Sequence, residues 1–328
     1  MSLESQNLHS DIKPAGGRLM GIWVVVGLCV VALAWFYLGQ QRYGPDRTFS
    51  AAKWIWHAWN PETGYEHGPI FPLVIAGLII YQIRTLRGLR SEGSWLGLAI
   101  VLIGAIFYAL GHRALQPRIT MGALPFLMWG SALYLWGWGV ARMLAFPLFF
   151  FWMAIPLPSF QQATVQLQLL VANFSQILSG WLRVETYVDG TTVLPVKGNW
   201  EPLEIAGGCS GIRSLMALLM ISAAWAYVAK ISFWKRAVLF LAAIPLAIFG
   251  NILRITSIFV IADYGDPKWA RETWHDWSGL LLFYPISIGF LLLTHSILEG
   301  RFPWKRAPRR EVRRVVRQAL AQSTTSSP

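Results

Sequence analysis

The stretch E-I-A-G-G-C-S-G-I-R-S-L, from Glu204 to Leu215, leads into an apolar run that begins at Ile212 and continues to about Val228. Cys209 lies between two pairs of small residues, in the turn that opens this run. If the run is a helix, unpaired N–H groups and the positive end of the helix dipole lie near the thiol, and both favour the thiolate. The same pattern also fits a small apolar residue near a helix cap. The stretch therefore predicts a hydrophobic helix and leaves the role of Cys209 open.

The rest of the chain has the composition of a membrane protein. Of its 328 residues, 55% are hydrophobic and only 13% are charged. Too few polar residues remain to cover a water-soluble globule of this length, and several apolar runs are long enough to cross a bilayer. The sequence contains no C-x-x-C motif and no His/Cys cluster with metal-ligand spacing, so no cofactor or metal is expected. The composition predicts an all-α fold, a polytopic transmembrane helical bundle.

The apolar runs predict about eight spans and three regions of the chain. A polar N-terminal tail (1–18) precedes a transmembrane region (19–298), and a basic cytoplasmic tail (299–328) follows, which is expected to be disordered. The first run is too long for the apolar part of a cleavable signal peptide. The third and fifth runs are short, and the fifth contains Pro147, so their boundaries are soft. The predicted spans are 19–38, 66–83, 95–110, 123–140, 143–157, 212–229, 237–262 and 279–298.

The positive charges are divided unequally between the two sides of this topology. With both termini on one side, that side carries 17 Lys and Arg residues and the other side carries nine, while Arg213 and Arg254 fall inside predicted spans. Because cytoplasmic loops carry the excess of Lys and Arg, both termini are predicted to be cytoplasmic. The net charge of +12 is then explained by topology and contact with anionic membrane lipids, and no nucleic-acid partner is expected.

This topology brings three polar side chains toward one membrane boundary. Cys209 precedes the sixth span, Arg254 lies roughly 12 Å below the outer end of the seventh, and His275 comes just before the eighth. An arginine within a span costs several kcal/mol unless it is paired or solvated, so Arg254 is either functional or part of a structural pair. His275, in a Trp-rich loop, is either a base or an interfacial anchor. Arg213 could hold the thiolate or pair with Glu204.

Five motifs, spread from about residue 54 to 298, resemble those of the exosortase/archaeosortase family of polytopic membrane cysteine proteases or transpeptidases. They are G-Y-E-H-G-P (Gly64 to Pro69), F-P-L-F-F-F-W-M-A-I-P-L-P (Phe146 to Pro158), the Cys-Ser-Gly core, N-I-L-R (Asn251 to Arg254) and the His before the last span. The resemblance implies that Cys209, Arg254 and His275 form the catalytic set. Family members usually have Ser where this chain has Glu66, which affects no proposed catalytic residue.

The resemblance implies an enzyme that cleaves exported proteins at the outer face of the cell inner (plasma) membrane through a Cys209 thioester. Its substrates would carry a C-terminal sorting motif, a transmembrane helix and a basic cytoplasmic cluster. Two other functions fit the same residues. A transporter or lipid-linked-sugar flippase could line its path with Arg213 and Arg254, and a membrane thiol acyltransferase could use Cys209 and His275 on a lipid acyl donor.

Overall fold

The computed structural model describes residues 15–88, 92–156, 160–198, 200–204 and 212–300. The chain divides into two compact units, 1–163 and 164–328. The described part is mostly helical, and this confirms the expected helical membrane protein. Eight spans and cytoplasmic termini stay predictions. Four described helical stretches are long and apolar enough to cross a membrane, namely Leu96–Arg113, Pro117–Ala154, Phe233–Tyr264 and Pro267–Glu299, and three shorter apolar helices are Trp23–Gly39, Ile70–Gln82 and Arg213–Val228.

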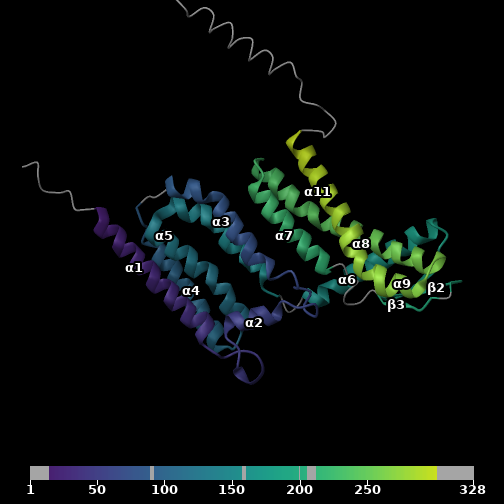
Figure 1. Ribbon diagram of the computed structural model, residues 1–328, viewed down its shortest axis with the longest axis horizontal. Coiled ribbons are helices and arrows are strands. Elements are labelled where there is room, and N and C mark those ends of the chain that lie inside the picture. The colour runs from purple at the N-terminus through teal and green to yellow at the C-terminus, as the bar shows by residue number, and fades with distance from the viewer. Residues whose placement is uncertain (1–14, 89–91, 157–159, 199, 205–211, 301–328) are drawn as a thin grey trace, which may run out of the picture. The chain divides into compact units, whose positions relative to one another are not determined.

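The first unit is built around two closely packed helices, α4 (Leu96–Arg113) and α5 (Pro117–Phe149), which lie side by side in Figure 1. Its buried core joins the segment after the first helix to α2, to the first half of α5 and to the end of the unit. The Tyr37 hydroxyl donates to the Thr120 carbonyl at 2.9 Å within this core. The elements are α1 (Ala15–Ala34), η1 (Trp35–Gly39), η2 (Pro45–Arg47), α2 (Ala51–Ala58), α3 (Ile70–Gly88), α4 (Leu96–Arg113), α5 (Pro117–Phe149) and η3 (Phe150–Ala154).

Helix α5 folds back on itself at Gly137, where φ is 75° and ψ is −175°. Glycine adopts a positive φ without the steric cost that a side chain brings. The Trp129 ring, before the break, lies 5.6 Å from the Phe149 ring, and its Nε1 donates to the Ala141 carbonyl at 2.6 Å. In a straight helix the two rings would be about 30 Å apart, so the two limbs run antiparallel. The turn thus lies a few residues before the predicted boundary at 140–143.

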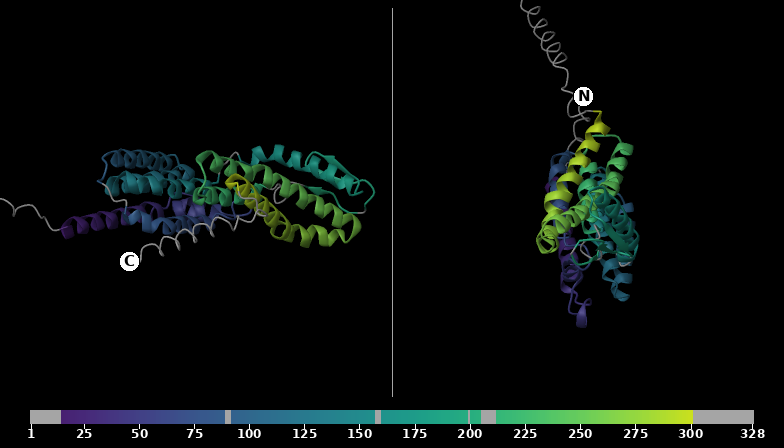
Figure 2. Two further views of the ribbon diagram at one scale, coloured as in Figure 1. Left: turned by 90° about the horizontal axis from the view of Figure 1, so that it is seen from above. Right: turned by 90° about the vertical axis from the view of Figure 1, so that its right-hand side faces the viewer.

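The second unit contains a bundle of three long helical stretches, which Figures 1 and 2 show side by side in green and yellow. These are α7 (Ile212–Val228), α8 (Phe233–Tyr264) and a continuous stretch from Pro267 to Glu299. The last stretch comprises α9 (Pro267–Trp269), η5 (Ala270–Trp274), α10 (His275–Ser278), η6 (Gly279–Phe283) and α11 (Tyr284–Glu299). An apolar core runs between α7, α8 and α11, and it includes Leu218, Leu239 and Leu291.

The second unit also contains a helix and a sheet that the sequence did not predict. The helix is α6 (Phe160–Trp181), and the antiparallel sheet is made of β1 (Thr186–Asp189), β2 (Thr192–Pro195) and β3 (Leu203–Glu204) in that order. Thr186 lies opposite Pro195, and Thr192 lies opposite Glu204. The expected all-α fold is therefore wrong in this region. The strands are too short and too polar to be detected as membrane spans. The Asp-Gly pair at 189–190, with φ 61° at Gly190, is nevertheless typical of a hairpin turn.

Gly250 sets the distance between α8 and the last helical stretch. A Cβ atom at this position would lie 2.5 Å from the Ser287 Oγ and 2.9 Å from the Phe283 ring. Ala243 and Ala247 precede Gly250 on the same face of α8 and are buried. Small residues of this kind let membrane helices approach each other closely.

Gly250→Leu should therefore destabilise the second unit. Overpacking of this kind costs about 1–3 kcal/mol, and here it would force two helices apart. The measurement is the thermal unfolding midpoint of the purified protein in detergent. Gly289→Leu is the matched control, because a Cβ atom at Gly289 would meet nothing within 4 Å. Equal midpoints for the two variants would contradict the close approach at Gly250.

Candidate active site

Arg254 joins α8 to the short helix α10. Its side chain is only 6% exposed. Nε donates to the Ser278 Oγ at 3.0 Å, and one terminal nitrogen, Nη2, donates to the main-chain carbonyl of His275 at 2.8 Å. The Ser278 hydroxyl donates to the same carbonyl at 2.9 Å. A guanidinium presents several donors in a fixed plane, so these contacts fix the position of the His275 backbone against α8 in a way that a lysine could not reproduce.

His275 lies inside the continuous helical stretch and not in a loop before it. The stretch begins at Pro267, and Asp266 caps it by accepting hydrogen bonds from the backbone N–H groups of Lys268 and Trp269. The sequence placed the last span at 279–298, so the helix begins about three turns earlier than predicted. Pro267 at the first helical position and Asp266 before it are typical of a helix start, and the search for apolar runs passed over them.

Two π-helical segments flank the turn that carries His275. The segments are η5 and η6, which lie directly before and after α10. A π-helical turn is rare and occurs frequently at functional sites, because it shifts the direction of the side chains that follow. The main-chain carbonyl of His275, which Arg254 and Ser278 bind, belongs to the turn between the two segments.

The imidazole of His275 is paired with the neighbouring carboxylate. Its Nδ1 lies 3.0 Å from the Asp276 Oδ1, and the side chains are 21% and 79% exposed. An ion pair with so exposed a partner contributes little to stability. When Nδ1 carries the proton, however, the Asp276 carboxylate accepts it, and this leaves Nε2 with the lone pair that a general base needs.

A second pair of contacts ties α8 to the same region. The Trp274 Nε1 donates to the Ser257 Oγ at 2.8 Å, and the Ser257 hydroxyl donates to the Arg254 carbonyl at 2.6 Å. Ser257, Ser278 and Asp276 were not among the residues predicted from the sequence. Ser278 could have been found, because it lies three residues after His275 and therefore on the same face of a helix. Once the helix is known to include His275, the spacing in W-H-D-W-S-G predicts that Ser278 and His275 lie on the side of the helix that Arg254 contacts.

The start of α7 lies beside the part of α8 that carries Arg254. The two helices are antiparallel because residues 229–232 join them directly, and the Ser222 hydroxyl donates to the Phe240 carbonyl at 3.5 Å. Ile212 lies ten residues before Ser222, and Gly250 lies ten residues after Phe240. Because the two helices are antiparallel, Ile212 comes level with Gly250. Cys209, the predicted nucleophile, lies outside the described residues, as do the other residues from 205 to 211.

Residues on either side of the G-Y-E-H-G-P motif contact the motif from Phe146 to Pro158 within the first unit. Trp59 donates from Nε1 to the Ala154 carbonyl at 2.8 Å, and the Phe71 ring lies 5.1 Å from the Phe150 ring. His67, of the G-Y-E-H-G-P motif, is buried before the start of α3. The segment around the first motif thus packs on the second motif within that unit.

Comparison with known proteins gives one family. A model of the transmembrane exosortase family matches residues 59–293, which is more than half of the chain. This range includes Arg254, Ser278 and His275 from the second unit, the predicted nucleophile Cys209, and His67 from the first. No curated protein and no solved structure matches the chain.

Proposed function

The chain belongs to the transmembrane exosortase family, and on that premise we propose that it is a membrane-embedded cysteine protease or transpeptidase with Cys209, Arg254 and His275 as its catalytic residues. The observation that carries the proposal is the contact of the buried Arg254 guanidinium with the main-chain carbonyl of His275. An arginine within a span is costly unless it is paired or solvated, and such residues commonly mark functional sites. Here it binds the helical turn that presents an imidazole.

The position of α7 supports Cys209 as the nucleophile. Cys209 comes three positions before Ile212, and an extended chain of three residue steps spans at most about 11 Å. Because the start of α7 comes level with Gly250, one turn before Arg254, a chain of this length is long enough for the thiol to reach the neighbourhood of the Arg254–His275 contact, as the proposal requires.

In the proposed reaction His275 takes the proton of the Cys209 thiol, and the thiolate attacks the carbonyl carbon of a substrate peptide bond. The tetrahedral intermediate collapses when the C–N bond breaks, and His275 returns the proton to the leaving amine. A thioester between Cys209 and the exported part of the substrate remains. Water or another nucleophile then attacks the thioester and frees the thiol. Arg254 holds His275 in place and stabilises negative charge that develops nearby.

The proposed substrates are exported proteins with a C-terminal sorting motif, a transmembrane helix and a basic cytoplasmic cluster. The test is co-expression with a tail-anchored reporter of this form. The chain should convert the reporter to a shorter form in a gel, whereas cells without the chain should not. A reporter that gains mass as a lipid adduct, with no cleavage, would instead indicate the thiol acyltransferase.

The proposed site faces the outside of the plasma membrane, and reporter fusions test this orientation. Fusions after Arg87 and Lys235 should report the cytoplasm, whereas fusions near Lys197 and Lys268 should report the outer side. The physical reason is the excess of Lys and Arg in the loops assigned to the cytoplasm. Cytoplasmic signals at 197 and 268 would contradict an extracytoplasmic site.

A further inference from the structure

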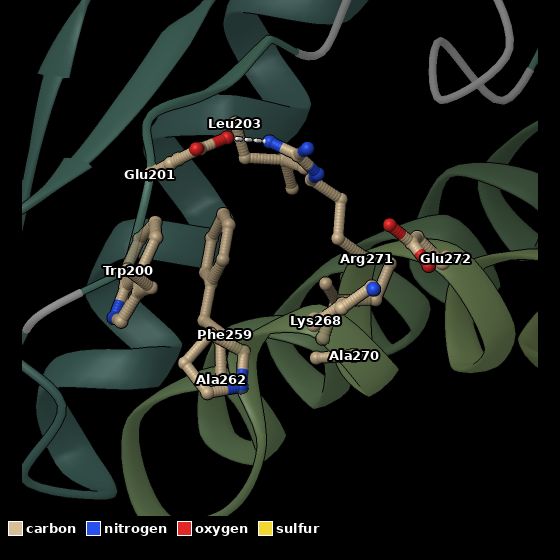
Figure 3. Close-up of a pocket in the computed structure, with 11 residues that line it drawn as sticks. Trp200, Glu201, Leu203, Phe259, Ala262, Lys268, Ala270, Arg271 and Glu272 are labelled. Atoms are coloured by element: carbon tan, nitrogen blue, oxygen red, sulfur yellow. Dashed lines mark hydrogen bonds and ion pairs between the residues drawn. The ribbon is translucent and has the colours of Figure 1, made fainter.

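A cavity of about 400 Å³ lies in the second unit, between the segment before β3, the end of α8 and the first turns of the last helical stretch (Figure 3). Its walls are apolar. The Trp200 ring stacks on the Phe259 ring, with 5.7 Å between centroids and 12° between planes, and Trp200 Nε1 donates to the Asp263 carboxylate at 3.4 Å. These contacts fix a flat aromatic wall. Leu203, Ile258 and Ala262 complete the apolar lining.

The mouth of this cavity is charged. Glu201 and Arg271 form an ion pair across it, and both side chains are at least half exposed to water. Lys268 and Glu272 also belong to the lining. In Figure 3 the Glu272 carboxylate lies on the far side of the Arg271 side chain from the Trp200–Phe259 wall. An occupant therefore reaches the apolar walls past groups that donate and accept hydrogen bonds.

The cavity shares its two helical walls with the proposed active site. Ile258 lies one turn after Arg254 on α8, and Arg271 lies one turn before His275 on the last helical stretch. Four residues of helix rise about 6 Å, which equals about two residues of an extended peptide at about 3.3 Å each. Ala262, one turn farther along α8, extends this reach to about four residues.

We propose that this cavity binds one large apolar side chain of the peptide substrate, two to four residues from the bond that is cleaved. The inference rests on the proposed function and adds a specificity site to it. The walls fit an apolar side chain, and the charged mouth fits the N–H and C=O groups of the peptide backbone on either side of it. The ester and phosphate oxygens of a lipid only accept hydrogen bonds, whereas a peptide backbone offers donors as well as acceptors to a mouth that carries both carboxylates and cations, so a peptide is the better match.

The probe is a set of tail-anchored reporters that carry a randomised eight-residue segment before the transmembrane helix. Segments that the wild-type protein cleaves should share one position, two to four residues from the cut, occupied by Leu, Met, Phe, Ile or Val. Ala262→Leu narrows the cavity. It should lower cleavage of reporters with Leu or Phe at that position by about tenfold or more, and leave a reporter with Ala there unaffected.

Ala242→Leu is the matched control for this variant. It makes the same change on the same helix, at a half-buried residue outside the cavity lining, and should leave the substrate profile as in wild type.

A second measurement leaves the apolar walls of the cavity unchanged. Lys268 at the mouth is replaced by the photo-crosslinking residue p-benzoylphenylalanine in a Cys209→Ala background, so that binding is read without cleavage. Reporters with the apolar residue should cross-link, and reporters with Asp in its place should not.

The two readouts separate the cavity from the proposed function. Cross-linking that depends on the apolar residue, with no cleavage by the wild-type protein, would retain the cavity and reject the protease. Cleavage by wild type with an identical profile in Ala262→Leu would retain the protease and reject the cavity. Cross-links formed with lipid alone, identified by the mass of the adduct, would also overturn the peptide assignment.

Discussion

Cys209→Ala should reduce cleavage of a tail-anchored reporter to less than about one thousandth of the wild-type rate, because removal of an attacking nucleophile eliminates the covalent step. The variant should be expressed and inserted as well as wild type, since it removes a single sulfur atom. The measurement is the mobility of the co-expressed reporter in a gel, normalised to the amount of protein in the membrane.

The control for this variant is the other cysteine. Cys29 is a free thiol in α1, within the first unit, and it lies in the apolar run 19–38, which contains no charged residue and no histidine. Cys29→Ser should therefore leave cleavage unchanged. Undiminished cleavage by a well-expressed Cys209→Ala protein would reject the cysteine-protease mechanism. Loss of cleavage in a normally expressed Cys29→Ser protein would show that Cys29 is the nucleophile or that both cysteines are needed.

Thiol labelling separates the protease from the transporter. A nucleophile beside a base reacts with small alkylating reagents added outside the cell, and the reaction should abolish activity. A transporter that lines its path with Arg213 and Arg254 gives no reason for such a thiol. The hydrogen bonds of Arg254 to Ser278 and to the His275 carbonyl favour a role in holding the site together.

The hydropathy of the sequence predicted most of the helices but located few of their ends. An apolar run has the same composition at a turn and inside a helix, so the runs did not locate the reversal at Gly137. Helix α6 and the strands were missed because their stability comes from packing within the unit. Val184 and Val193 belong to one buried cluster with Ile255 and Phe259 of α8, and the sequence alone does not pair residues so far apart.

The structure brings two of the predicted site residues together, through contacts that the sequence did not predict. Arg254 and His275 were expected at one membrane boundary, and the structure brings them together through a side chain and a backbone carbonyl. The guanidinium binds the peptide group of His275 and not its ring. Ser278 was not predicted, since its role depends on a helix that includes His275 and on the π-helical segments beside it. Such backbone details do not follow from composition or spacing.

Arg254→Lys should reduce reporter cleavage by about a hundredfold, because small displacements of a catalytic group have costs of that order. A lysine keeps the charge but cannot donate to the Ser278 Oγ and to the His275 carbonyl in one fixed plane. Ser278→Ala removes only one acceptor of Arg254 and one donor to His275, so a smaller loss of about tenfold is expected. Ser222→Ala is the matched control, because Ser222 is an equally buried serine on α7.

The rate of Cys209 alkylation by iodoacetamide distinguishes the two roles of Arg254. Alkylation needs the thiolate but no stabilisation of an oxyanion. If Arg254 positions His275, then Arg254→Lys and Ser278→Ala should slow alkylation in parallel with cleavage, and His275→Ala should slow it at least as much. If Arg254 acts mainly on the oxyanion, cleavage should fall while alkylation stays at the wild-type rate. The two hydrogen bonds to α10 favour the first result, and a wild-type alkylation rate in Arg254→Lys would contradict the positioning role.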